Sequence, residues 1–297
     1  MSGIAKGAAG PIPAPRRDYA HVRAIVTSPA FLPGIAIAGG ILAAFWDLLR
    51  TLPELYLDND GYYSHGFFLP LTAIYVIHKN WPKLKTLPVK PAYWVLAPLL
   101  ATFLLLRVVT ITEMFAFMSI MLAASMLLGV WFVAGLRWMK AVTLPILYLL
   151  LGLPIWSMAI NTYTNPLQLL STKAAYTLLE LTGFRPYRDG TTIRLNHFNL
   201  DVGIPCSGLK LVVALTAFTA FFMMIARLRA WANVLLAALI LPMALLFNGL
   251  RIAAIGMVGE IWGEAAGRQF HDYSGYLMLI VCFFTFFKLA RWLGWKD

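Results

Sequence analysis

Eight windows of about 20 residues, nearly all of them apolar, restrict the fold of this chain more than any other feature. Each window is long enough to cross the hydrocarbon core of a bilayer as an α-helix. The whole chain is 60% hydrophobic and only 12% charged, which is more apolar surface than a soluble domain can bury. We therefore predict an all-α integral membrane protein with a single domain over residues 1–297. The eight windows lie at residues 32–52, 63–80, 92–110, 113–133, 138–157, 206–226, 231–250 and 275–292.

Lysine and arginine are spread unevenly over the segments between these windows. If the N-terminus is cytoplasmic, the inner segments hold 15 of the 24 basic residues and only two of the 13 acidic residues. This positive-inside pattern predicts that both termini are cytoplasmic (N-in, C-in), with residues 1–30 as a cytoplasmic tail. The tail has no apolar core of a cleavable signal peptide, so we expect the first window to direct insertion. The net charge of +11 then faces anionic lipid, and no nucleic acid partner is needed to explain it.

The longest segment expected outside the cytoplasm covers residues 158–205. Its first part, NPLQLLSTKAAYTLLELTG, has apolar residues near helical spacing. This spacing predicts an amphipathic helix at the outer membrane interface, ended by Gly183. The following YRDGTTIRLNHFNLDVG contains Asp-Gly and then alternating apolar residues, which is typical of a small β-hairpin.

The sixth window begins at its outer end with IPCSGLK, in which Pro205 suits the first turn of a helix. A cysteine in that turn lies among backbone N–H groups at the positive end of the helix dipole, and this environment favours the thiolate of Cys206. Lys210 follows one turn later on the same helical face and adds a positive charge. Ser207 and Gly208 are small and leave room for a substrate. The alternative is that the cysteine only fills space and the lysine side chain reaches toward the interface.

Two more windows bring polar residues to the same predicted face. The seventh ends with Asn248 and Arg251, and the donors of an arginine suit a carboxylate or a developing oxyanion. An interfacial anchor is the alternative role for this arginine. His271 precedes the eighth window, and histidine is the usual group that takes a proton from a nucleophilic cysteine. We do not expect Asp272 to orient the histidine ring, because consecutive side chains of a helix point apart.

Other polar residues on this face have simpler explanations. His65 and His197 are competing histidines, and each is also explained as a structural interfacial residue. Glu260 and Glu264 have helical i, i+4 spacing, which suits a solvated face, with a metal site as the alternative.

The second cysteine is expected to pack in the membrane. Cys282 lies 11 residues beyond His271 and is therefore ~16 Å deeper, which argues against a disulfide with Cys206. The chain has no HExxH, paired CxxC, glycine-rich phosphate loop or GxSxG motif. We therefore predict no metal and no cofactor.

Four motifs taken together resemble the exosortase/archaeosortase family. They are PCSGLK at 205–210, NGLRI at 248–252, His271 before the last window, and YSHGFFLPL at 63–71. Their order and the eight-window layout match that family over nearly the whole chain. The resemblance implies a membrane cysteine transpeptidase that cleaves C-terminal sorting signals of exported membrane-anchored proteins. Such a signal, PEP-CTERM in type, consists of a short PEP-like motif, a membrane span and a basic tail.

The resemblance also implies roles by position. Cys206 is the nucleophile, Arg251 the oxyanion or carboxylate partner, and His271 the acid and base. Supporting residues are Lys210, Asn248, His65 and Ser207. Pro205 and Lys210 depart from the family pattern, in which a small residue precedes the cysteine and arginine often replaces the lysine. The implied location is the inner (cytoplasmic) membrane, with the site facing the periplasm or exterior and an acceptor that the sequence does not identify.

Two other functions stay open at this level. The chain could be a non-enzymatic membrane component or transporter of polysaccharide export, although a transport path should place ionisable groups near the middle of the bilayer. It could also be a membrane hydrolase in which water replaces the acceptor. Hydrolysis and transfer share the same acylation step.

Overall fold

The computed structural model describes residues 31–58, 61–112, 114–226 and 228–295. The predicted tail at 1–30 therefore lies outside the described residues, as do the basic residues Arg227 and Lys296 of the charge pattern. Ten α-helices make up most of the described chain. They are α2 (Phe31–Ala44), α3 (Trp46–Leu57), α4 (Phe68–Leu84), α5 (Leu96–Ile111), α6 (Phe115–Ala134), α7 (Leu136–Leu149), α8 (Ser157–Leu181), α9 (Leu209–Ile225), α10 (Ala230–Trp262) and α11 (Glu264–Trp292).

The helices confirm a multi-pass membrane protein but not the predicted number of eight spans. Four helical segments are long and apolar enough to cross a bilayer: 93–111, 115–134, 230–262 and 264–292. Two bent pairs would raise the number to six, since α2 meets α3 at 64° and the segment 136–152 meets α8 at 58°. Helices α4 and α9 coincide with predicted windows but have only 17 residues each. Eight spans and the N-in, C-in orientation stay predictions.

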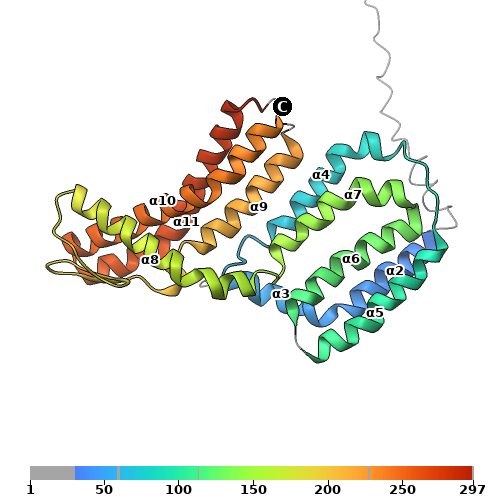
Figure 1. Ribbon diagram of the computed structural model, residues 1–297, viewed down its shortest axis with the longest axis horizontal. Coiled ribbons are helices and arrows are strands. Elements are labelled where there is room, and N and C mark those ends of the chain that lie inside the picture. Colours follow the sequence, from blue (N-terminus) through green and yellow to red (C-terminus); the bar gives the residue numbers. More distant parts are fainter. Residues whose placement is uncertain (1–30, 59–60, 113, 227, 296–297) are drawn as a thin grey trace, which may run out of the picture.

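Figure 1 shows an elongated arrangement in which the first and last helices lie far apart. Helices α2 and α5 pack on α6, and α7 packs on the other side of α6 and against α4. At the opposite end α9, α10 and α11 form a second group around Leu215, Phe222 and Phe286. Cys282 is fully buried in this second group and forms no disulfide with Cys206, as predicted.

The predicted amphipathic helix is present as α8, and its packing positions the loop that follows. Ala175 and Leu179 of α8 are fully buried against α10 and the small sheet. Gly183, with a φ of +90°, follows the end of α8, which agrees with the stop predicted there. The placement of α8 at a membrane interface stays a prediction.

The predicted hairpin is a three-stranded antiparallel sheet of β1 (Tyr187–Asp189), β2 (Thr192–Arg194) and β3 (Asn199–Asp201) in the order β1-β2-β3. Ile193 of the middle strand pairs with both neighbours, opposite Arg188 and Leu200. A third strand forms because Leu195 N–H donates to the Phe198 carbonyl at 2.9 Å and closes a second turn. The buried Ile193 and Leu200 pack toward α8 and α10.

The sheet also fixes the sharp turn from α10 into α11. The ring of Phe198 lies so close to Gly259 that a Cβ atom there would meet ring carbons at 2.5–2.6 Å. A Cβ on Gly267 would meet the Cα of Gly259 at 2.9 Å, so the two helices approach closely at this point. Only glycine permits this contact, which brings the first turns of α11 back beside α10.

Candidate active site

Cys206 lies in a short 3₁₀ turn, η3 (Ile204–Cys206), and not in the first turn of the sixth predicted helix. Helix α9 begins three residues later, at Leu209. The prediction was wrong at this point because Gly208 adopts a φ of +85°, which interrupts the helix. A Cβ on Gly208 would also come within 3.1–3.2 Å of the side chain of Asn248. The turn therefore projects Cys206 ahead of α9.

Two buried side chains from other helices hold this turn. Asn248 of α10 donates from Nδ2 to the carbonyl oxygen of Cys206 at 2.7 Å. Ser171 of α8 donates from Oγ to the carbonyl oxygen of Ser207 at 3.0 Å. Ser207 itself accepts from the backbone N–H of Leu209 at 3.4 Å, at the start of α9. Because these partners are buried, the backbone around Cys206 is fixed by α8 and α10 and by a local bond within the turn.

The thiol of Cys206 meets the imidazole of His271, although 65 residues separate them in sequence. The Sγ and Nε2 atoms lie 3.1 Å apart. On its other side the ring contacts Asp272, with 3.3 Å between Nδ1 and Oδ1. The expectation that Asp272 points away was wrong, because both side chains lean together on the exposed side of α11. An Nδ1 proton donated to the carboxylate leaves Nε2 as the acceptor for the thiol proton.

His271 belongs to the polar first turns of α11, ahead of the apolar part predicted to span the membrane from residue 275. The pKa of His271 is raised, chiefly by its hydrogen bond with Cys206. Partial burial and the charge of Arg251 oppose this shift, while Asp272 adds to it. A higher pKa favours the imidazolium form, which is the form that pairs with a thiolate.

Arg251 of α10 is bound to the same turn of α11. Its Nε donates to Ser274 Oγ at 3.1 Å, and one terminal nitrogen donates to the carbonyl oxygen of His271 at 3.3 Å. The Ser274 hydroxyl donates to that carbonyl as well, at 3.0 Å. The guanidinium and the imidazole therefore keep a fixed spacing. Ser274 was not singled out from the sequence, although its position three residues after His271 on one helical face could have indicated this contact.

A cavity of about 360 Å³ opens in front of these groups. Its polar lining includes Ser64, Lys210, Asn248, Arg251, His271 and Asp272. Two of these side chains are cations, so the cavity favours a carboxylate or a developing oxyanion. Lys210 thus reaches the site as expected, and Ser64, which sequence reasoning passed over, joins it.

His65 does not line this cavity. Its Nε2 lies 3.2 Å from the carbonyl oxygen of Leu151 in the buried turn before α4. A buried ring held by a backbone carbonyl suits a structural histidine.

The remaining acidic and histidine candidates also have structural partners. Glu260 accepts from the backbone N–H of His197 at 2.9 Å, which ties the sheet loop to α10. Glu264 forms an exposed ion pair with Arg268. Among the residues that the structure describes, no three His, Cys, Asp or Glu side chains come together as metal ligands would.

The family model described as transmembrane exosortase (Exosortase_EpsH) matches residues 57–288, which is most of the chain. The matched range contains Cys206, Arg251 and His271, as well as Ser64 and Lys210 of the cavity wall. No curated protein and no solved structure matches the chain.

Proposed function

Because the chain belongs to the transmembrane exosortase family, we propose that it is a membrane cysteine transpeptidase that cleaves C-terminal sorting signals of exported proteins. The single observation that best supports this proposal is the 3.1 Å contact between Cys206 Sγ and His271 Nε2, since the imidazole also lines a cavity with two cationic side chains. A thiol paired with an imidazole is the arrangement that activates cysteine nucleophiles. The charge pattern assigns this site to the extracytoplasmic side of the cytoplasmic membrane.

In the first step, Cys206 passes its proton to Nε2 of His271. The thiolate attacks the carbonyl carbon of the scissile peptide bond, so a carbon–sulfur bond forms and the carbonyl π electrons move to oxygen. This negative charge develops in a cavity bounded by Arg251 and Lys210. Cations held in place before the reaction stabilise such a charge without further rearrangement.

In the second step, the tetrahedral intermediate collapses. The carbon–nitrogen bond breaks, and His271 returns its proton to the departing amine. The product is a thioester between the exported protein and Cys206, together with the released signal. An acceptor amine then attacks the thioester and regenerates the thiol, and water in its place gives hydrolysis.

The substrate's membrane span would lie beside α9–α11, with its basic tail in the cytoplasm. This arrangement brings the short motif on the other side of the span up to the cavity. An acidic residue in that motif would meet Lys210 and Arg251.

The two cysteines give a matched test of the nucleophile. A reporter carrying a sorting signal is co-expressed with the wild type, Cys206→Ala or Cys282→Ala, and its processing is followed by gel shift. We expect Cys206→Ala to abolish processing and Cys282→Ala to retain it, because Cys282 packs between helices. Intact mass spectrometry should find the covalent adduct only when Cys206 is present. Normal processing by Cys206→Ala would refute the nucleophile assignment and favour the non-enzymatic export component.

A further inference from the structure

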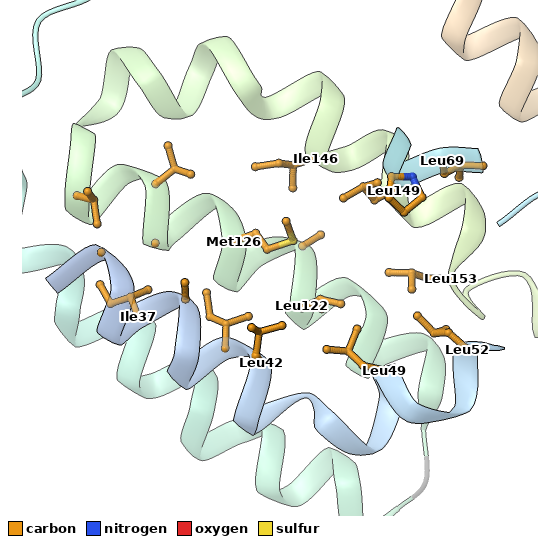
Figure 2. A pocket seen from close by; sticks show the side chains of 18 of the residues that line it. Ile37, Leu42, Leu49, Leu52, Leu69, Leu122, Met126, Ile146, Leu149 and Leu153 are labelled. Atoms are coloured by element: carbon orange, nitrogen blue, oxygen red, sulfur yellow. The ribbon is translucent and has the colours of Figure 1, made fainter. Parts of the chain in front are cut away.

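A second, larger cavity lies far from Cys206, between the helices of the first group. It has a volume of about 710 Å³, and its walls are almost entirely apolar. Figure 2 shows it between α2 and α6 on one side and α7 on the other, closed at one end by the last turns of α3 and α7. We refer to this cavity as the α2–α7 pocket. Side chains that define it include Ile37, Leu49, Leu122, Met126, Ile146 and Leu153.

The pocket is a feature of the packing and not a loose contact between neighbouring helices. A Cβ on Gly129 of α6 would meet Ile37 of α2 at 3.0 Å, so α2 and α6 approach closely. Helix α7 packs on α6 through Ala123, Val142 and Ile146. Both contacts are tight, and the space remains where α2 and α7 diverge across α6 (Figure 2).

The volume of the pocket decides what can fill it. An apolar cavity of ~150 Å³ holds one benzene, or roughly 25 Å³ per carbon, so this pocket accommodates about 28 carbons, which is one to two acyl chains. A transmembrane helix about 10 Å across and ~30 Å long occupies roughly 2,400 Å³ and is far too large. Water is a poor occupant because apolar walls offer it no hydrogen bonds. A hydrocarbon chain of a lipid fits both the size and the chemistry.

The end of the pocket that lies farthest from α3 is next to positively charged residues. Gly34, Ala134 and Trp138 line this end. The backbone N–H of Lys90 donates to the carbonyl of Ala134 at 3.0 Å, so the basic segment before α5 lies against it. Arg137 is next to Trp138 in the first turn of α7, with Lys140 one turn further, and the side chains of all three basic residues are exposed.

These charges suit the phosphate of an anionic lipid. The positive-inside pattern assigns this end to the cytoplasmic leaflet, where anionic headgroups attract Lys and Arg clusters. The indole of Trp138 donates to the Leu87 carbonyl at 3.3 Å, a position typical of an interfacial tryptophan. We propose that the α2–α7 pocket binds an acyl chain of an anionic phospholipid, with the headgroup held near Lys90 and Arg137.

The test uses the full chain reconstituted in vesicles that contain phosphatidylglycerol with a photoreactive diazirine near the end of one acyl chain. After illumination, labelled peptides are mapped by mass spectrometry. Ala38 and Ala36 are both exposed residues of α2, but only Ala38 lines the pocket. We expect Ala38→Phe to reduce labelling of α2, α6 and α7 several-fold and Ala36→Phe to leave it unchanged.

The headgroup site is tested separately with Arg137→Gln/Lys140→Gln. We expect this double variant to reduce labelling by phosphatidylglycerol but not by phosphatidylcholine with the same chain. Equal labelling of Ala38→Phe and Ala36→Phe, or labelling spread evenly over exposed positions such as Leu104 of α5, would overturn the pocket. If the double variant reduced labelling by phosphatidylglycerol and by phosphatidylcholine equally, the proposed binding site for an anionic headgroup would be overturned. Because no reporter protein is involved, a failure here leaves the proposed peptidase untouched.

Discussion

The cavity beside Cys206 is lined by several polar and charged side chains, whereas the α2–α7 pocket is lined almost entirely by apolar ones. The first lining suits chemistry, and the second results from helix packing. The first is half the volume of the second, about 360 against 710 Å³, yet cations, an imidazole and a carboxylate reach it from three elements of the chain. The second is larger but presents almost only carbon. The comparison teaches that the convergence of fixed polar groups, and not cavity size, is the reason to propose chemistry at this end of the molecule.

The walls of the two cavities are also stabilised by different interactions. Around Cys206, directional hydrogen bonds donated by Ser171 and Asn248, and one accepted by Ser274 from Arg251, set the positions of backbone and side chains. Around the α2–α7 pocket, dispersion between apolar side chains sets the positions of the helices, and these contacts tolerate small shifts. Substitutions should therefore affect the processing rate at the first cavity and mainly stability at the second.

The largest effect is expected from His271→Ala. Loss of the general base and acid should lower the rate of reporter processing by about 10²–10⁴-fold. His78→Ala, an exposed histidine of α4, is the matched control and should process normally. If both variants kept the wild-type rate, His271 would not be the general base and acid, and the polar cavity would not be the site of the reaction.

Arg251→Lys should have the next largest effect. Lysine keeps the charge but cannot reproduce the bonds to Ser274 and to the His271 carbonyl, so we expect a loss of roughly 10²-fold in rate. Arg107→Lys on the exposed face of α5 controls for the substitution itself. A single-turnover assay of thioester formation measures the step concerned, and an unchanged rate there would contradict the role of Arg251.

Asp272→Asn should change the pH profile more than the maximal rate. The pKa of His271 is raised chiefly by Cys206, with a further contribution from Asp272, so removing the carboxylate charge should lower this pKa. Imidazolium is the form below that pKa, and the alkaline limb of the processing rate should therefore move to lower pH. The same sign holds for stability, since a raised histidine pKa stabilises the fold below the unfolded pKa and this contribution fades as pH rises through the folded value. Asp201→Asn on the sheet should leave the profile in place.

The smallest effect on rate is expected from Ile146→Ala in the α2–α7 pocket. Deleting a buried isoleucine should lower the free energy of unfolding by roughly 2 kcal/mol, the low end of the usual range, because lipid and not water is the alternative environment. Processing per folded molecule should stay within about twofold of wild type, as judged by activity normalised to a thermal unfolding assay. A rate loss as large as that of Arg251→Lys would show that the two regions are coupled.

Much of this fold can be predicted from the sequence because long apolar windows indicate membrane helices. Each of the eight windows overlaps at least one helix, and α8 and the strand region lie where amphipathic and alternating patterns predicted them. The convergence of Cys206, Arg251 and His271 was predicted as well, through residue type, position and the family resemblance.

What the sequence missed depends on local backbone geometry and on contacts between distant segments. The left-handed Gly208 moves the start of α9 past Cys206, and no periodicity in IPCSGLK reveals that φ. The side chain of Asp272 bends toward His271 although helical geometry separates neighbours. The α2–α7 pocket arises from the angle between packed helices, which hydropathy does not encode.

The length of α10 has a consequence for where a substrate can be cut. From Ala230 to Arg251 the helix rises ~31 Å, which equals the ~30 Å thickness of the hydrocarbon layer. If the hydrocarbon layer begins at Ala230, the last 11 residues of α10 would stand clear of it, and the close approach of Gly259 to Gly267 braces them against α11. In the proposed function, this length of α10 would set the sulfur at headgroup height, and the spacing between a substrate's motif and its membrane anchor would select the bond presented to it.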